Sequence, residues 1–320
     1  MRTTIFVFVL IFATCQCQTS VCPSKEETKP CICRLGKGSK AWMSCKGLTS
    51  ADELREAVKG MKGFKFSTFY IEDSDIGILP ADIFRDIDIQ VLSIQFTNLT
   101  SLSESVNRPP FLGLENSLES IEIRDGFVDE NAPLTKFSIS HLKKVYFVHL
   151  EGNIIPVIGN DWFESGPYGL RELYLFDTSV TKIGSHAFEA LEDIRKLSIT
   201  GGKFSEIART MFPKPALFLE VLDLSNNALR TLSNDLFTHM PALEEVYLDN
   251  NVLTSLNEVT WTPVWSQINF ANFYGNPIKC DQDLKWIYKY RLPESFQGQC
   301  SSPPELKGRS LSNLTLADFS

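Results

Sequence analysis

The sequence predicts an α/β solenoid, in which short repeated units stack side by side and their strands form one parallel sheet. Three observations predict it. Residues 219–232 are followed 24 residues later by residues 243–256, with every apolar position in register. Within each copy, apolar and polar side chains alternate, as in a half-buried strand. Cysteines gather before the first unit and after the last, where the apolar ends of a solenoid must be covered.

Both copies follow the pattern L-x-x-L-x-L-x-x-N-x-L, and Asn227 of the first corresponds to Asn251 of the second. This pattern is the signature of a leucine-rich repeat, whose unit contains one strand and a return segment. We therefore expect a leucine-rich repeat horseshoe with a parallel concave sheet and a cap at each end. Solenoids of this kind present one long surface, so the first expectation is binding rather than chemistry.

About nine units are expected over residues 65–275. Their first strand residues, which we call anchors, are Phe69, Leu92, Ile121, Val145, Leu173, Leu197, Leu222, Val246 and Ala271. Two positions after each anchor the side chain is apolar again. Two steps between anchors are longer than the others, from Leu92 to Ile121 and from Val145 to Leu173. They contain residues 106–116 and 159–168, and insertions of this kind form loops that either bind a partner or have no role.

The asparagine position shows how regular the stack is. Its amide is expected to bond backbone groups that the tight turn leaves unpaired. Asn227, Asn251 and Asn276 suit this role, and shorter versions of the bond are expected from Ser74, Thr97 and Thr178. No such bond is expected from Gly126, Leu150 and Gly202. The middle of the stack is therefore predicted to be less regular than its C-terminal third.

Cysteines are expected to cap both ends. Cys22, Cys31, Cys33 and Cys45 precede the first unit with the spacing C-x8-C-x-C-x11-C. Zinc is the competing interpretation, but two ligands separated by one residue are too close for a usual zinc knuckle. Disulfides are therefore expected, and the sequence leaves their connectivity open. No metal site and no cofactor is predicted.

The cysteine flanks carry a family resemblance. The opening Cys22-Pro with Cys31-x-Cys33, and the closing Asn276-Pro277 with Cys280 and Cys300, resemble the flanks of secreted leucine-rich repeat proteins. The resemblance implies an N-terminal cap over residues 18–64 and a C-terminal flank over residues 276–320. Gln282 stands where the family usually has another cysteine, so the resemblance implies one bridge there, between Cys280 and Cys300.

Within that family the chain resembles the arthropod group that includes the non-catalytic leucine-rich subunit of the Oplophorus luciferase. The resemblance lies in the Cys-Pro opening, the irregular early repeats and the reduced C-terminal flank. It implies a subunit that does no chemistry and accompanies a protein partner, such as a catalytic subunit.

The N-terminus predicts secretion. Arg2 is followed by an apolar run over residues 5–13, which is too short to span a bilayer and is typical of a signal peptide, here assigned to residues 1–17. No transmembrane or lipid anchor is predicted. The acceptor sequons at Asn98 and Asn313 are consistent with a secreted glycoprotein. The mature chain is expected to carry 30 basic and 39 acidic residues, which disfavours nucleic acid as a partner.

The sequence contains few residues in arrangements typical of catalysis. The four histidines, His141, His149, His186 and His239, share no metal-binding spacing, and no nucleophile elbow or phosphate loop is present. The chain is therefore not expected to be an enzyme.

The concave face is more informative. With the anchors above, Tyr146 and Tyr174 lie on adjacent strands beside Val148 and Phe176, which predicts an exposed aromatic and apolar patch. The predicted partner-binding set also contains Tyr247 and three acidic residues, Glu122, Asp223 and Asp249. The carboxylates of these three favour a basic rim on the partner. The competing interpretation is that the aromatics stack across strands and only stabilise the sheet.

Three functions remain open. The first is a secreted scaffold that binds a protein partner through the concave face. The second is a non-catalytic accessory subunit of an extracellular oxidoreductase, which would co-purify with an active catalytic chain. The third is immune or matrix recognition of glycans or glycoproteins.

Overall fold

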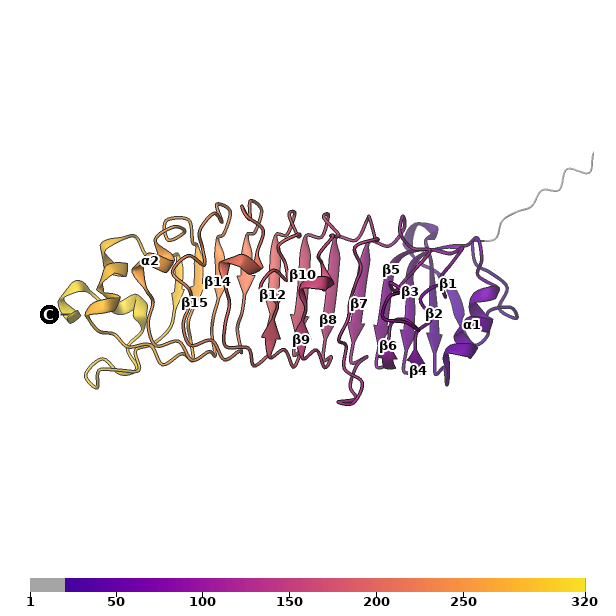
Figure 1. Cartoon of the computed structure of the whole chain (residues 1–320), viewed down its shortest axis with the longest axis horizontal. Helices are drawn as coiled ribbons and strands as arrows, with labels where there is room; N and C mark the ends of the chain where they lie inside the picture. Colours follow the sequence, from indigo (N-terminus) through magenta and orange to yellow (C-terminus); the bar gives the residue numbers. More distant parts are fainter. Residues whose placement is uncertain (1–20, 320) are drawn as a thin grey trace, which may run out of the picture.

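The computed structural model describes residues 21–319, so the predicted signal peptide lies outside the described residues. The strands stand side by side along one elongated stack, with α1 (Ala51–Lys59) at the N-terminal end and α2 (Glu258–Trp261) toward the other (Figure 1). The leucine-rich repeat solenoid predicted from the repeats is confirmed. Its return segments contain few helices, and most of them consist of turns, short strands and single 3-10 turns.

One sheet of 12 strands forms the concave side. Its order is β1 (Ile32–Leu35), β2 (Ala41–Lys46), β3 (Lys65–Glu72), β5 (Asp88–Gln95), β7 (Ser120–Arg124), β8 (Phe147–Glu151), β10 (Glu172–Phe176), β12 (Lys196–Ile199), β13 (Val221–Asp223), β14 (Glu245–Tyr247), β15 (Phe270–Asn272) and β16 (Ser295–Gln297). β1 and β2 are antiparallel, and the other neighbouring pairs are parallel. In the return segments, β4 (Asp75–Ile78) pairs with β6 (Asn98–Ser101), and β9 (Val157–Ile158) pairs with β11 (Lys182–Ile183).

The register of the fourth unit differs from the prediction. Val148, and not Val145, is the anchor, because Val148 pairs with Ile121 on β7 and with Leu173 on β10. Both valines are fully buried, so hydrophobicity alone does not distinguish them. The corrected anchors place the second long step between Ile121 and Val148. Residues 159–168 then belong to a unit of ordinary length and are not an insertion.

The corrected register reveals an asparagine that the prediction missed. Asn153 lies five positions after Val148 and donates to the carbonyls of Ile123 and Glu151, both at 2.8 Å. Its Oδ1 accepts from the backbone amides of Gly126 and Phe127, at 3.1 and 3.0 Å. Four bonds from one buried side chain therefore join two adjacent units.

Other asparagine positions follow the prediction with one exception. Asn251 and Asn276 bond backbone groups in their own and the preceding units, and Asn227 donates to the Ile199 carbonyl. The hydroxyl of Thr178 is buried and makes no hydrogen bond with the described residues, so the expected bond there is wrong.

Every unit turns through a left-handed residue four positions after its anchor. These residues are Asp73, Phe96, Asp125, Gly152, Asp177, Gly201, Asn226, Asn250 and Gly275, with φ between 45° and 75°. Glycine, asparagine and aspartate tolerate this conformation better than other residues do. Phe96 is the exception in the row, and its side chain is 60% exposed.

The core lies between the sheet and the return segments and runs through the whole stack. Phenylalanines of successive return segments touch there: Phe163 and Phe188 have ring centroids 6.2 Å apart, and Phe188 and Phe212 have ring centroids 6.3 Å apart. Since each unit buries its apolar edge only against its neighbours, the end units need covers.

Disulfides close both ends. Cys22 pairs with Cys33 and Cys31 with Cys45 at the N-terminal end, which resolves the connectivity that the sequence left open. At the other end Cys280 pairs with Cys300, as the family resemblance implied. Gln282 donates a hydrogen bond to the Phe319 carbonyl, so the position that lacks a cysteine still joins the flank to the C-terminal segment.

Candidate binding face

The middle of the concave face carries four aromatic rings, which we call the central cluster: Phe147 and His149 of β8, and Tyr174 and Phe176 of β10. Ring centroids of Phe147 and Tyr174 are 5.6 Å apart, and those of His149 and Phe176 are 5.3 Å apart. Alternation along a strand puts these side chains on the solvent side of the sheet, while Val148 and Leu175 point into the core. The cluster therefore occupies the sixth and seventh strands of the 12-stranded sheet.

The structure corrects two members of the predicted set. Val148 is fully buried and does not belong to the concave surface. Tyr146 precedes β8, is 45% exposed, and makes no ring contact with the cluster among the described residues. Phe147 and His149 take their places, because the strand begins later in the chain than predicted. Asn153 is the signal that would have found them, since it follows Val148 at the same spacing as Asn227 follows Leu222.

His149 is the one cluster member with an imidazole ring. Its Nε2 lies 3.3 Å from a Glu151 oxygen without the alignment of a hydrogen bond, and Arg124 contacts the same carboxylate at 3.3 Å. Burial lowers the pKa of His149, and the charge of Arg124 lowers it further, while Glu151 and Glu122 act in the opposite direction. The ring is therefore neutral at pH 7, and Glu122 lies beside it on β7.

Two of the three tyrosines of the predicted set, Tyr174 and Tyr247, are held by glutamates on their own strands. The Tyr174 hydroxyl donates to Glu172 at 2.9 Å, and the Tyr247 hydroxyl donates to Glu245 at 2.8 Å. Burial and then the hydrogen bond to Glu245 raise the pKa of Tyr247 to about 12. Both phenols therefore stay protonated, and each ring is fixed in one orientation as a flat apolar surface.

A depression of about 300 Å³ separates the central cluster from Tyr247. Tyr174 and Phe176 line one wall, and Tyr247 lines the other. The ring of Tyr247 packs on that of Phe270, with centroids 4.6 Å apart. The floor is lower because Ser198 of β12 is small, and its hydroxyl donates to Asp223 at 2.9 Å. Tyr247 is therefore not part of the central cluster, although Tyr247 and the cluster both line this depression.

Carboxylates without ion-pair partners border the depression. Within residues 21–319, Asp223, Glu245 and Asp249 form no ion pair, whereas Glu220 pairs with Arg195 at 2.7 Å. Burial raises the pKa of Asp249, and the neighbouring charge of Asp223 raises it further. This end of the concave face therefore carries uncompensated negative charge.

The asparagines of the two predicted glycosylation sequons lie on the surface. Asn98 and Asn313 are both exposed, and the Asn98 side-chain amide donates to Asp75 at 2.9 Å. Among the described residues, no group of three or more histidine, cysteine or acidic side chains could hold a metal ion. None of the helices within residues 21–319 is long and apolar enough to span a membrane.

Comparison with known proteins supports this architecture. The leucine rich repeat family model matches residues 193–253. The Oplophorus-luciferin 2-monooxygenase non-catalytic subunit of Oplophorus gracilirostris is 24% identical over 330 residues, covering 93% of this chain and 87% of that protein. Toll-like receptor 9 of Mus musculus is 23% identical over 168 residues, which are 51% of this chain and only 16% of the receptor.

A solved structure shows the same fold. The crystal structure of human trophoblast glycoprotein (Wnt-activated inhibitory factor 1) superimposes with a TM-score of 0.55 and 18% sequence identity. The match covers 90% of this chain and 98% of that chain. This chain is thus a leucine-rich repeat solenoid with disulfides at both ends, similar along most of its length to the non-catalytic subunit of the Oplophorus monooxygenase.

Proposed function

We propose that this chain is a secreted, non-enzymatic scaffold that binds a protein partner through its concave face. The observation that carries the proposal is the contiguity of the central cluster, four rings in mutual contact on the solvent side of two adjacent strands. The four rings are half-buried, and contiguous aromatic side chains that remain accessible to solvent are typical anchors of protein interfaces. The disulfides at both ends suit an oxidising, extracellular compartment.

The negative charge at one end of the concave face indicates the chemistry of a matching partner. Asp223, Glu245 and Asp249 lie at this end of the concave face without ion-pair partners among the described residues, so the matching surface carries lysine or arginine side chains. The rings provide apolar area at the centre, and the carboxylates select and orient the partner at one side. We therefore propose a partner with an apolar centre flanked on one side by basic residues.

A second candidate follows from the similarity over 93% of the chain to a protein named as the non-catalytic subunit of a monooxygenase. We propose as the alternative that the partner is a catalytic chain and that this scaffold stabilises or accompanies it. Co-purification of an enzymatic activity with this chain, absent from the chain alone, distinguishes this alternative.

Affinity capture from the secreted fluid of the source tests the proposal. The bait is compared with a Tyr174→Ala/Phe176→Ala variant and with Tyr168→Ala as the matched control, because Tyr168 is exposed but lies in a return segment. We expect one protein to be recovered by the wild type and by Tyr168→Ala at equal levels, and at least tenfold less by the double variant.

Thermal unfolding of all three baits separates binding from stability. If the double variant unfolds at a much lower temperature than the wild type, the rings act as a stabilising stack and the docking proposal loses its support. Recovery of the same protein by all three baits would contradict a concave docking site. A glycan ligand would lose affinity in the double variant but depend little on salt, because it carries no basic rim.

A further inference from the structure

A pocket of about 220 Å³ lies on the return-segment side of the stack, between the two longest units. One wall is residues 100–110, which belong to the long step from Leu92 to Ile121. The other wall is residues 133–141, which belong to the long step from Ile121 to Val148. The additional residues of these two units therefore enclose a space between neighbouring return segments.

The lining of the pocket combines buried apolar side chains with hydroxyl and basic side chains. Leu102, Pro110, Phe127 and Leu134 are buried side chains of its lining. Val106 also lines it and is 73% exposed, so its side chain lies at the open side of the pocket. Small-molecule sites combine apolar side chains, which bury the body of the ligand, with polar groups that fix its orientation.

The wall formed by residues 101–108 is held by its own serines. The Ser101 hydroxyl donates to the Ser103 carbonyl at 2.6 Å and accepts from the Ser103 amide at 3.2 Å. The Ser105 amide donates to the Ser103 hydroxyl at 3.3 Å, and the Arg108 amide donates to the Ser105 carbonyl at 3.0 Å. Such turns hold the loop in place before any ligand arrives, which lowers the entropy cost of binding.

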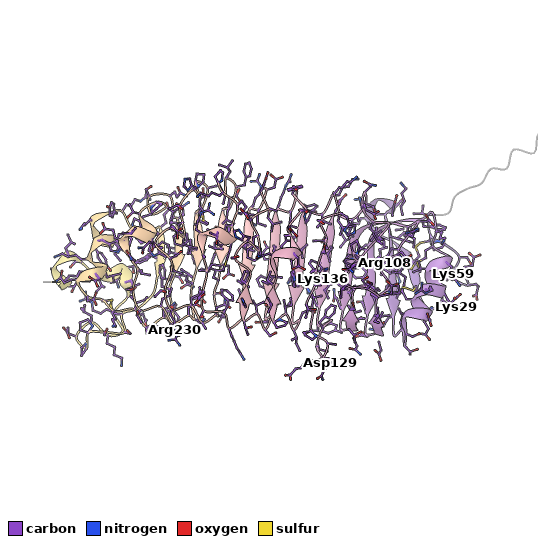
Figure 2. All side chains as sticks on the ribbon, in the orientation of Figure 1. Lys29, Lys59, Arg108, Asp129, Lys136 and Arg230 are labelled. Atoms are coloured by element: carbon purple, nitrogen blue, oxygen red, sulfur yellow. A yellow bond between two sulfur atoms is a disulfide. The ribbon has the colours of Figure 1, made fainter. Side chains whose placement is uncertain are left out.

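The charged side chains that line the pocket are basic, although the acidic partners of Arg108 lie just outside the lining. Among the described residues the lining contains Arg108, Lys136 and His141 but no aspartate or glutamate, in a chain whose net charge is −8. Figure 2 shows Arg108 and Lys136 close to each other along the stack. A locally cationic lining in an acidic protein favours an anionic group on the ligand.

Arg108, His141 and Lys136 differ in whether they carry a charge that no neighbouring group compensates. Arg108 is held by Asp82 at 2.6 Å and Glu104 at 3.5 Å, so its charge is compensated. Burial lowers the pKa of His141, against the opposing effects of Glu115 and the Pro110 carbonyl, and the ring is neutral at pH 7. Lys136 forms no ion pair within residues 21–319 and therefore supplies the free positive charge.

We propose that this pocket binds a small amphiphilic anion, with its apolar body against Leu102, Phe127 and Leu134 and its carboxylate at Lys136. The volume equals that of about seven waters at roughly 30 Å³ each, which suits a medium-chain fatty acid of the size of octanoate. The site lies on the opposite side of the stack from the central cluster, so it goes beyond the proposed protein docking.

Isothermal titration of the full mature chain with three probes of equal length tests the proposal. The probes are octanoate, octan-1-ol and octylamine, which share the apolar body and differ in the charge of the head group. We expect octanoate to bind one site per chain at least tenfold more tightly than either other probe. Equal affinity for all three, or no binding of octanoate, would overturn the proposal.

Two variants place the binding in this pocket. Lys136→Gln is expected to reduce octanoate affinity to that of octan-1-ol, whose own affinity stays unchanged, whereas Lys143→Gln, an exposed lysine outside the lining, has no effect. Val106→Asp puts a carboxylate at the exposed mouth and is expected to weaken octanoate binding at least tenfold without disturbing the fold. Octanoate binding that survives both pocket variants would place it elsewhere and refute the site.

Discussion

The rings of His149 and Phe176 meet edge to face across the β8–β10 strand pair, with centroids 5.3 Å apart and planes at 81°. In this arrangement the positive edge of one ring points to the negative face of the other, which is the favoured geometry for aromatic pairs. A protonated imidazole in the same place would sit in a half-apolar setting beside Arg124. The central cluster is therefore a surface whose properties depend on pH.

Acidification should destabilise the chain through His149. Its pKa in the folded chain is below the ordinary value of 6.5, so the unfolded chain binds this proton first. The contribution of His149 to stability is then complete above pH 6.5 and is lost as the pH falls toward the folded pKa. Denaturant unfolding between pH 7.5 and 5 should show a shallower loss of unfolding free energy in His149→Gln than in the wild type.

His186→Gln is the control for that experiment, since His186 is exposed and contacts Glu189 at 2.9 Å. An identical pH slope in the wild type and in His149→Gln would contradict the assignment. The same acidification should weaken partner binding, because docking desolvates His149 further and disfavours its charged form.

Removing the Asn153 side chain should be costly. Asn153→Ala leaves two backbone amides and two backbone carbonyls without their partner in a buried turn. An unfilled buried hydrogen-bonding group costs about 1–3 kcal/mol, so we expect a loss of about 3 kcal/mol in unfolding free energy. Urea denaturation measures it, and Asn116→Ala, at an exposed asparagine, should change stability by less than about 0.5 kcal/mol.

Phe96 should gain stability when replaced by a residue suited to its backbone. Its φ is 49°, and Phe96→Asn is expected to raise the unfolding free energy by about 1 kcal/mol. The reverse change at the equivalent turn of another unit, Asn226→Phe, should lower it by a similar amount. Thermal or urea unfolding of the two variants checks both directions, and a loss of stability in Phe96→Asn would show that the exposed ring makes favourable contacts.

Arg209 should not be replaceable by lysine. Its side chain is buried in the return segment and donates to the carbonyls of Thr238, Pro213 and Phe212, at 2.6, 2.7 and 3.3 Å. Lysine has one nitrogen where the guanidinium fork has three, so at least one carbonyl loses its partner. We expect Arg209→Lys to lower the unfolding free energy by about 2 kcal/mol.

Arg230→Lys provides the matched comparison, because Arg230 is exposed on the surface of the stack (Figure 2). It should unfold at the same denaturant concentration as the wild type. Equal stability of Arg209→Lys and Arg230→Lys would show that water replaces the lost fork without cost.

The repeat and the caps could be predicted from the sequence because they depend on local spacing. Leu222 and Val246 recur at a fixed step with the asparagine in register, and the cysteines stand at positions that are close in the folded cap. The pairing of the cysteines in the N-terminal cap could not be predicted, since it depends on how the antiparallel β1–β2 pair places them in space.

The candidate site was predicted only in part, and for a physical reason. Val145 and Val148 are both buried, so the alternation of apolar and polar residues is compatible with either valine as the first strand residue. The choice of Val145 wrongly placed Val148 on the surface and left His149 out of the central cluster. Asn153 resolves the ambiguity. The depression beside Ser198 could not be predicted, because it results from small and large side chains on neighbouring strands.

Hydrogen exchange of the chain with and without the captured partner tests the docking of the concave face most directly. We expect the slowed exchange on binding to concentrate in β8, β10 and β12, with the acidic strands β13 and β14 at the edge of the protected region. Protection confined to the return segments, with β8 and β10 unchanged, would contradict it.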